Sequence, residues 1–323
     1  MRSQVTEWEV FITSPISREH QRKRHSHSSA VCVWTDTDER KPFKMWNRRK
    51  VLLAAVVFTA LYYSVAAEEP KQLDMAPDAV DYLYDKCRNK AMDKFIHSGL
   101  LRQELNLTVG FRTAWNVSSQ CSKLIPGGIK EHTAALGAYI NGDFKDTFNS
   151  QVETMGGNVS TYENNFSFKS LHFLLMDYMV LQKPQTCKNV YVLSNEAVTA
   201  QVGSKVRLGR FTLAELSFST LEKTHDLYDE VILNITSCFF AEVGENICMK
   251  QTNTVLLSPA EEFTVESRNV TTDHNGEYNV IVLKASGQQG SNNCDIFSRS
   301  PAVVSTHVWL VLVLLSLSLS FFC

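Results

Sequence analysis

Residues 166–182 read FSFKSLHFLLMDYMVLQ, and they carry the clearest helical pattern in the chain. Their apolar side chains recur at spacings of three and four, which places them on one face of a helix: Leu171, Leu174, Leu175, Tyr178, Met179 and Leu181. Pro184 is expected to end this helix, because proline lacks a backbone N–H and clashes with the preceding turn. His172 lies within the apolar face, so we expect a hydrogen-bonded core residue and not a catalytic base.

The segments on either side of this helix differ in periodicity. Upstream, three segments have helical spacing: Asp78–Lys94, Lys130–Tyr139 and Asp143–Val152. Downstream, short runs rich in β-branched and aromatic residues predict strands: Asn189–Leu193, Lys205–Thr212, Glu230–Phe240, Thr254–Leu257, Glu262–Glu266 and Glu277–Leu283. Helices followed by strands indicate an α+β fold, with an N-terminal helical part packed on a C-terminal mixed or antiparallel β-sandwich core.

The composition restricts the classes of function. The chain has 323 residues, a formal net charge of −2 and 44% hydrophobic residues. These values argue against a wholly disordered chain and give no basic excess for binding nucleic acid. The sequence also has no glycine-rich dinucleotide motif after a strand, no P-loop and no Gly-x-Ser-x-Gly motif, which disfavours the Rossmann, nucleotide-triphosphatase and serine-hydrolase classes.

The N-terminal region contains an export signal. Residues 51–67 form an apolar run that follows three basic residues, ends in small residues and precedes two glutamates. This order is typical of a secretory signal peptide cleaved after Ala67. Residues 1–44 are polar and long for a signal's basic region, and Met45 follows them, so we expect 1–44 to be a non-native or untranslated extension and 45–67 to be the signal. A retained signal anchor with a cytosolic basic arm is the alternative.

The C-terminal region resembles an anchor signal. Val308–Cys323 is an uncharged apolar tail, preceded by a spacer and by several small residues. This layout is typical of a glycosylphosphatidylinositol (GPI) signal, so we expect residues 299–323 to be removed and Ser298, within the window Ser291–Ser300, to be the attachment residue. A short tail anchor is the alternative, although membrane helices usually need about 20 residues.

Residues 68–298 remain as one ectodomain with six cysteines: Cys87, Cys121, Cys187, Cys238, Cys248 and Cys294. An even number in an exported domain predicts disulfides, because the secretory pathway is oxidising. Zinc binding is the rival interpretation, but the chain has no Cys-x-x-Cys pair and no His-x-x-x-His helix. No metal is therefore expected.

The ectodomain also contains six Asn-x-Ser/Thr acceptor sites: Asn106, Asn116, Asn158, Asn165, Asn234 and Asn269. Each predicts local exposure, since an attached glycan must lie on the surface. Together with the two terminal signals, they predict a glycoprotein on the outer face of the plasma membrane.

Several sequence blocks follow one another in the ectodomain: Leu73–Asp78 ahead of Cys87, His132–Tyr139, Phe166–Leu175, Val206–Thr212 and Thr254–Pro259. In this order they resemble the vertebrate GPI-anchored mono-ADP-ribosyltransferases, which transfer ADP-ribose from NAD to arginine side chains and release nicotinamide. Phe166–Leu175 is similar to the family's FpfKsLHFLL helix, and Val206–Thr212 to its VRFGxFT strand. The resemblance implies an ADP-ribosyltransferase-like fold with an NAD cleft. It also implies that Arg207, Gly209 and Phe211 contact NAD in this cleft.

The resemblance also implies a disulfide pattern. The family joins its first and last cysteines and ties its strand region with a second bridge, which corresponds here to Cys87–Cys294 and Cys187–Cys238. Cys121 and Cys248 are then left to pair with each other.

The catalytic positions of the family are altered in this chain. Cleavage of the nicotinamide–ribose bond develops oxocarbenium character, which a nearby carboxylate stabilises. In the family an Arg binds the pyrophosphate, a Ser fixes the nicotinamide ribose, and a Glu-x-Glu pair supplies the carboxylates. At the matching positions this chain has Val192, Leu213 followed by Ala214, and the threonines Thr252 and Thr254.

Two interpretations of different class follow. The first is a catalytically impaired or inactive surface glycoprotein, monomeric, that keeps the transferase fold for binding, either of cell-surface or extracellular proteins or of a nucleotide in a retained cleft. The second is an active arginine ADP-ribosyltransferase that uses other residues, such as Ser219, Glu215 or Glu261. Ser219 could restore the family's serine only if the strand that contains it were shifted by seven residues.

Overall fold

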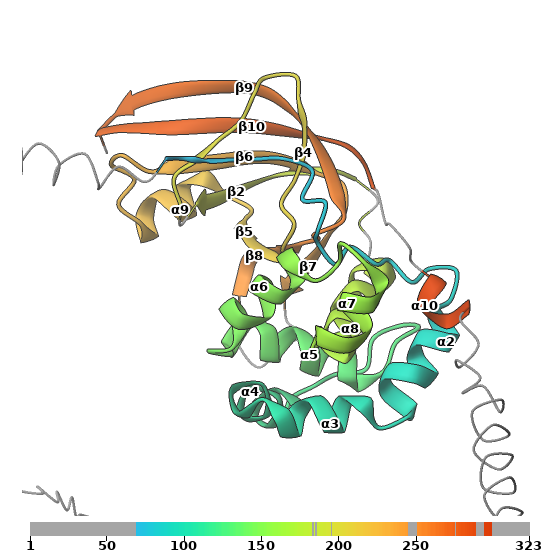
Figure 1. The fold of residues 1–323 in the computed structure, drawn as a ribbon. Helices are drawn as coiled ribbons and strands as arrows, with labels where there is room; N and C mark the ends of the chain where they lie inside the picture. The colour runs from blue at the N-terminus through green and yellow to red at the C-terminus, as the bar shows by residue number, and fades with distance from the viewer. Residues whose placement is uncertain are drawn as a thin grey trace, which may run out of the picture. The chain divides into compact units, whose positions relative to one another are not determined.

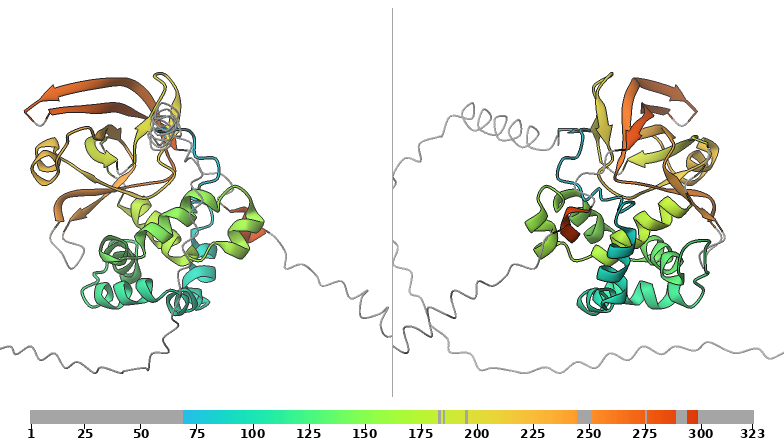
Figure 2. Two further views of the ribbon diagram at one scale, coloured as in Figure 1. Left: turned by 60° about the vertical axis from the view of Figure 1, so that its left-hand side comes forward. Right: turned by 90° about the vertical axis from the view of Figure 1, so that its right-hand side faces the viewer.

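The computed structural model describes residues 69–182, 184, 186–194, 196–244, 251–274, 276–288 and 294–298. The predicted N-terminal extension, signal peptide and anchor tail lie outside these ranges. Helices and strands form two layers, with the helical part on one side and a large curved sheet on the other (Figures 1 and 2). Within the described residues, no helix combines the length and apolar character needed to cross a membrane.

The helical layer is built almost entirely from the first half of the ectodomain. Its elements are α2 (Arg88–Met92), a π-helical turn (Asp93–His97), α3 (Leu100–Leu107), α4 (Val109–Ser119), α5 (Lys130–Asn141), α6 (Lys145–Thr154), α7 (Val159–Asn165) and α8 (Lys169–Leu181). The short α10 (Asp295–Ser298) returns to this layer, where Phe297 packs against Phe95.

Helix α8 is the centre of this layer and confirms the helix predicted from residues 166–182. Every residue from Ser170 to Met179 is buried. The Nε2 atom of His172 lies 2.8 Å from the carbonyl oxygen of Val80, and its Nδ1 lies 3.3 Å from the hydroxyl of Tyr84. Burial lowers the pKa of His172 to about 4, so the ring is neutral at physiological pH. His172 is thus a core residue, as predicted.

The prediction of one helix over Asp78–Lys94 is wrong for its first ten residues. Residues 80–84 have no regular structure, and helix begins only at Arg88. The backbone of Val80 instead donates to the carbonyl oxygen of Val152, and Tyr84 adopts a positive φ of 60°. The apolar spacing of this segment reflects burial on nearly all sides, because Val80, Tyr82 and Tyr84 are each at most 1% exposed.

The second half of the ectodomain forms an eight-stranded mixed sheet in the order β4-β9-β10-β6-β2-β5-β8-β7. The strands are β2 (Lys188–Ser194), β4 (Lys205–Arg207), β5 (Thr212–Glu215), β6 (Val231–Ser237), β7 (Phe240–Gly244), β8 (Gln251–Leu257), β9 (Glu261–Asp273) and β10 (Gly276–Gln288). β6 and β10 are parallel, and the remaining pairs are antiparallel. A separate parallel pair joins β1 (Lys71–Gln72) to β3 (Val198–Thr199).

Two predicted strands are each divided in the structure. Residues 205–212 contribute β4 and the first residue of β5, and residues 230–240 contribute β6 and the first residue of β7. Residues 218–224 form the helix α9 (Phe218–Thr224) directly after β5. The alternative in which Phe218–Thr220 replaces β5 in the sheet is therefore wrong.

The core has three parts. The largest lies between the helices and the β7–β8 end of the sheet and is rich in aromatic side chains. The second lies within the curved sheet and consists mainly of valine, leucine and isoleucine. A small third cluster packs Leu221 of α9 against Leu227, Ile232 and Tyr278.

The disulfides Cys87–Cys294 and Cys187–Cys238 are both present, as predicted from the family pattern. Cys121 is also disulfide-bonded, while its predicted partner Cys248 lies outside the described residues. Five of the six asparagines in acceptor sites are exposed, and the sixth, Asn234 in β6, is half-buried.

Candidate functional site

A cavity of about 350 Å³ lies where the 71–78 segment crosses the sheet. One wall is formed by the end of β2, from Val192 to Ser194, and another by residues 207–210 and Thr212. Glu153 and Thr154 at the end of α6 contribute a third wall. The cavity thus lies where the helical layer, the N-terminal segment and the sheet meet.

The cationic side chains of this cavity are all engaged by carboxylates. The Arg207 guanidinium is 7% exposed, forms an ion pair with Asp81, and donates to the carbonyl oxygens of Met75 (2.6 Å) and Ala76 (3.1 Å). Its role in the structure is to fasten the 74–81 segment to β4.

The other two cations share acidic partners. Arg210 forms ion pairs with Glu153 and, at 3.5 Å, with Glu196. The Nζ atom of Lys71 lies 3.7 Å from the same Glu196 carboxylate. Asp74 and Asp78 also line the cavity, so its walls carry more acidic than basic side chains.

The three residues predicted to contact NAD have different environments. Arg207 and Gly209 line the cavity, and Gly209 has a φ of +69° that disfavours any side chain. A Cβ atom at Gly209 would also lie 2.6 Å from the Cβ atom of Ala76. Phe211 is instead buried in the helical core, where it stacks on Phe148, and it is not a lining residue of the cavity.

The positions that match the family's catalytic groups carry no charge. Val192 is 8% exposed, lines the cavity and packs in the core of the sheet with Ala214. Leu213 packs against the helical core. Thr254 lies in β8, as does Thr252, whose side chain is outside what the structure describes.

One carboxylate lies beside these positions. Tyr191 in β2 is the register partner of Glu215 in β5, and Glu215 is the partner of Thr254 in β8. Directly paired residues point to the same face of a sheet. The Thr254 hydroxyl donates to Glu215 at 3.2 Å, so the only carboxylate in this row comes from β5.

The two remaining candidates are occupied by local contacts. The hydroxyl of Ser219 lies in α9, 2.8 Å from that of Ser217. Glu261 is 1% exposed and accepts hydrogen bonds from the Ser237 hydroxyl and from the backbone N–H groups of Cys238 and Phe239. Neither residue lines the cavity.

Sequence reasoning did not identify the acidic side of the cavity. Glu153, Glu196 and Asp78 come from three distant segments, and Glu153 and Glu196 belong to no motif. These segments come together only in the folded chain, where β1 pairs with β3 and the end of α6 lies at the same cavity.

Comparisons with known proteins agree with this architecture. A sequence model of the family described as NAD:arginine ADP-ribosyltransferase matches residues 73–291. Ecto-ADP-ribosyltransferase 3 of Mus musculus is 30% identical over 239 residues, which are 69% of this chain and 62% of that protein. The GPI-linked NAD(P)(+)–arginine ADP-ribosyltransferase 1 of Mus musculus is 28% identical over 279 residues, 77% of this chain and 84% of that one.

Solved structures give the same result. A crystal structure of a variant of the eukaryotic mono-ADP-ribosyltransferase ART2.2 in complex with NADH superimposes with a TM-score of 0.55 and 27% sequence identity. The match covers 69% of this chain and 97% of that one. With the family match over 73–291 and the shared α+β architecture, the chain belongs to the NAD:arginine ADP-ribosyltransferase family.

Proposed function

We propose that this protein is a cell-surface member of the family that does not catalyse arginine ADP-ribosylation by the family's mechanism. The observation that carries the proposal is the cavity wall at Val192. An apolar side chain stands there in place of the arginine that the family directs at the pyrophosphate, and the cations around the cavity are already paired.

The electrostatics of the cavity do not fit a pyrophosphate. Three basic side chains line it, and four acidic side chains line it as well: Asp74, Asp78, Glu153 and Glu196. A dianionic ligand would have to displace carboxylates from Arg210 or Lys71, because strong phosphate binding requires charge-assisted hydrogen bonds. Arg207 is less available still, since its ion pair with Asp81 is buried.

The groups for the chemical step are also missing. Thr254 cannot stabilise an oxocarbenium ion as a carboxylate does, and Leu213 cannot hydrogen-bond a ribose. Removal of one preorganised electrostatic group commonly costs about 10²–10³ in rate. The loss of several groups together predicts a transfer rate reduced by at least this factor, although such effects are not additive.

The transferase assay tests this proposal. The purified protein is incubated with labelled NAD and the arginine analogue agmatine, beside an active family member. We expect no transfer and no release of nicotinamide above background. Transfer at a rate within about tenfold of the active relative would overturn the proposal.

One observation favours a second candidate function, an active transferase with a relocated carboxylate. Glu215 lies 3.2 Å from the Thr254 hydroxyl and points to the same face of the sheet. If Glu215 stabilises the developing cation, then Glu215→Gln abolishes transfer while Glu215→Asp retains part of it.

The cellular location forms part of the proposal. The relatives named above are described as ecto-enzymes or as GPI-linked, and the exposure of five of the six acceptor asparagines supports an exported, glycosylated domain. We expect phosphatidylinositol-specific phospholipase C to release the protein from cells. We also expect the released protein to be a monomer, with cell-surface or extracellular proteins as its partners. Retention on the cell after this treatment would contradict the GPI anchor.

A further inference from the structure

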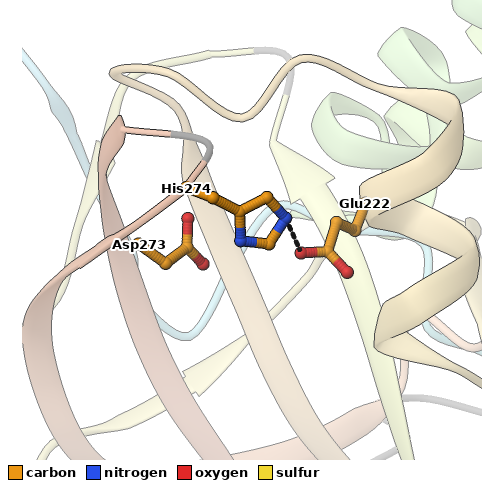
Figure 3. Close-up of side chains that lie close together, drawn as sticks. All are labelled: Glu222, Asp273 and His274. Carbon is orange, nitrogen blue, oxygen red and sulfur yellow. Dashed lines mark ion pairs between the residues drawn. The ribbon is translucent and has the colours of Figure 1, made fainter.

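A group of three potential metal ligands lies outside the cavity, where the tip of the β9–β10 hairpin meets α9 (Figure 3). Glu222 comes from α9, Asp273 is the last residue of β9, and His274 follows it in the turn. One ligand atom from each residue lies within 4.8 Å of the other two. None of the three residues lines the 350 Å³ cavity, so this group is independent of the site described above.

We propose that Glu222, Asp273 and His274 bind one divalent transition-metal ion of the Zn²⁺ type, which fastens the hairpin tip to α9. Imidazole nitrogen and carboxylate oxygen are both ligand types of protein-bound Zn²⁺, and the imidazole favours a transition metal over Mg²⁺ or Ca²⁺. Water would complete the coordination of such a three-ligand site.

The distances fit this donor set. The His274 Nε2 atom lies 3.2 Å from Oε1 of Glu222. Two ligands in a tetrahedral zinc site are about 3.4 Å apart, given metal–ligand bonds of about 2.1 Å. Figure 3 shows the His274 ring between the two carboxylates, with its Nε2 atom facing Glu222.

The Asp273 carboxylate has an orienting partner. The hydroxyl of Tyr278 donates to its Oδ2 atom at 2.8 Å. Hydrogen bonds of this kind orient metal-binding carboxylates in protein sites.

The two elements that carry the ligands are already held together beneath the site. Tyr278 and Leu221 pack in the same buried cluster, and the rings of Phe218 and Tyr278 are 6.4 Å apart. The backbone of Asp229 also donates to the carbonyl oxygen of Glu277. The ligands therefore project from a preorganised surface, which lowers the entropic cost of binding an ion.

The charges also favour a cation. With a neutral imidazole, the group carries two negative charges from its carboxylates, and a divalent ion neutralises both. Metal binding requires that neutral imidazole, so the His274–Glu222 ion pair is the competing metal-free state.

The chain offers a matched control. His97 and Asp93 form an exposed pair with Nδ1 and Oδ1 3.0 Å apart, similar to the His274–Glu222 pair. The metal-ligand group found within the described residues does not include them. A variant of His97 thus removes an exposed, carboxylate-paired histidine without touching the proposed site.

The test is calorimetric titration of the glycosylated protein, purified from cells expressing the full chain, with ZnCl₂ after treatment with a chelator. We expect one equivalent to bind with a Kd at or below about 10 μM. The affinity should fall more than about 100-fold in His274→Ala and Asp273→Asn and about tenfold in Tyr278→Phe, while His97→Ala binds as the wild type does. Circular dichroism verifies that each variant is folded.

Cobalt supplies a second measurement that does not depend on a variant. Co²⁺ added in place of Zn²⁺ should give visible d–d absorption bands, typical of low coordination by nitrogen and oxygen ligands, and these bands should be absent in His274→Ala. The proposal is overturned if the wild type binds no Zn²⁺, or if His274→Ala binds with unchanged affinity.

Discussion

The substitution Glu261→Ala distinguishes a structural carboxylate from a catalytic one. The Glu261 side chain accepts hydrogen bonds from the Ser237 hydroxyl at 2.5 Å, from Cys238 N at 2.7 Å and from Phe239 N at 3.0 Å. Together with the Cys187–Cys238 disulfide, these bonds hold the corner between β6 and β7. Alanine would leave three donors without this acceptor in a region where Ser237 and Phe239 are at most 1% exposed.

The magnitude follows from these three donors. A buried donor left unsatisfied costs about 1–3 kcal/mol, and local relaxation recovers part of the total. We therefore expect Glu261→Ala to lower the free energy of unfolding by about 3–6 kcal/mol. For a domain of this size, that loss corresponds to a fall in Tm of roughly 6–24 °C.

Differential scanning calorimetry of the two proteins measures this change, with Glu266→Ala as the control. Glu266 lies on the same strand, but its side chain is 46% exposed and its ion pair with Lys284 lies on the surface. We expect the control to change the free energy of unfolding by less than about 0.5 kcal/mol. A Tm for Glu261→Ala within about 2 °C of the wild type would refute the structural role.

Three further predictions concern buried groups. Burial lowers the pKa of His172 in the folded protein to about 4, below its unfolded value. Its neutral ring therefore contributes about 3 kcal/mol to the free energy of unfolding above pH 6.5, and this contribution is lost as the pH falls to 4. His172→Gln should remove this acid-induced loss in unfolding titrations, and an unchanged pH profile would contradict the prediction. Glu104 accepts hydrogen bonds from the N–H groups that begin α8, and burial raises its pKa to about 7. Its contribution to the free energy of unfolding is therefore present below pH 4.5 and lost as the pH rises through 7. Glu104→Gln should flatten this decline of stability with pH. Gly156→Ala would place a Cβ atom 2.1 Å from the carbonyl oxygen of Ala79, so it should lower the free energy of unfolding by roughly 3 kcal/mol in denaturant titrations. Gly203→Ala is the control: its Cβ atom would have no neighbour within 4 Å, and it should cost only about 1 kcal/mol because of its positive φ. Equal losses in the two variants would contradict the steric argument.

Local sequence patterns predicted the elements whose burial is one-sided or complete. Helix α8 has a broad apolar face and is followed by a proline, and both features can be read from neighbouring residues in the sequence. The strands of the sheet were located for the same reason, because β-branched runs separated by turn residues give a local signal.

The segment before α2 shows where local patterns fail. Val80, Tyr82 and Tyr84 are buried by α6, α7 and α8 together, so their spacing reflects a path through the core and not a helical face. Helix α9 was missed for the opposite reason, since its seven residues bury little besides Leu221.

The candidate site was only partly predictable. The family resemblance identifies Val192, Leu213 and Thr254 as altered positions, and this identification depends on aligned motifs alone. The acidic partners of the cavity and the Glu222–Asp273–His274 group depend on contacts between distant segments, which no spacing in the sequence encodes. The sequence offers Glu261 as a substitute carboxylate, and only its hydrogen bonds show its part in the β6–β7 corner.

Calorimetric titration with NAD measures most directly whether this cavity can hold a dinucleotide. We expect no binding by the wild type at about 1 mM NAD, and measurable binding after Val192→Arg, since a longer cationic side chain at that wall can extend into the 350 Å³ cavity. Wild-type binding with a Kd of a few micromolar, unchanged by Val192→Arg, would contradict the account.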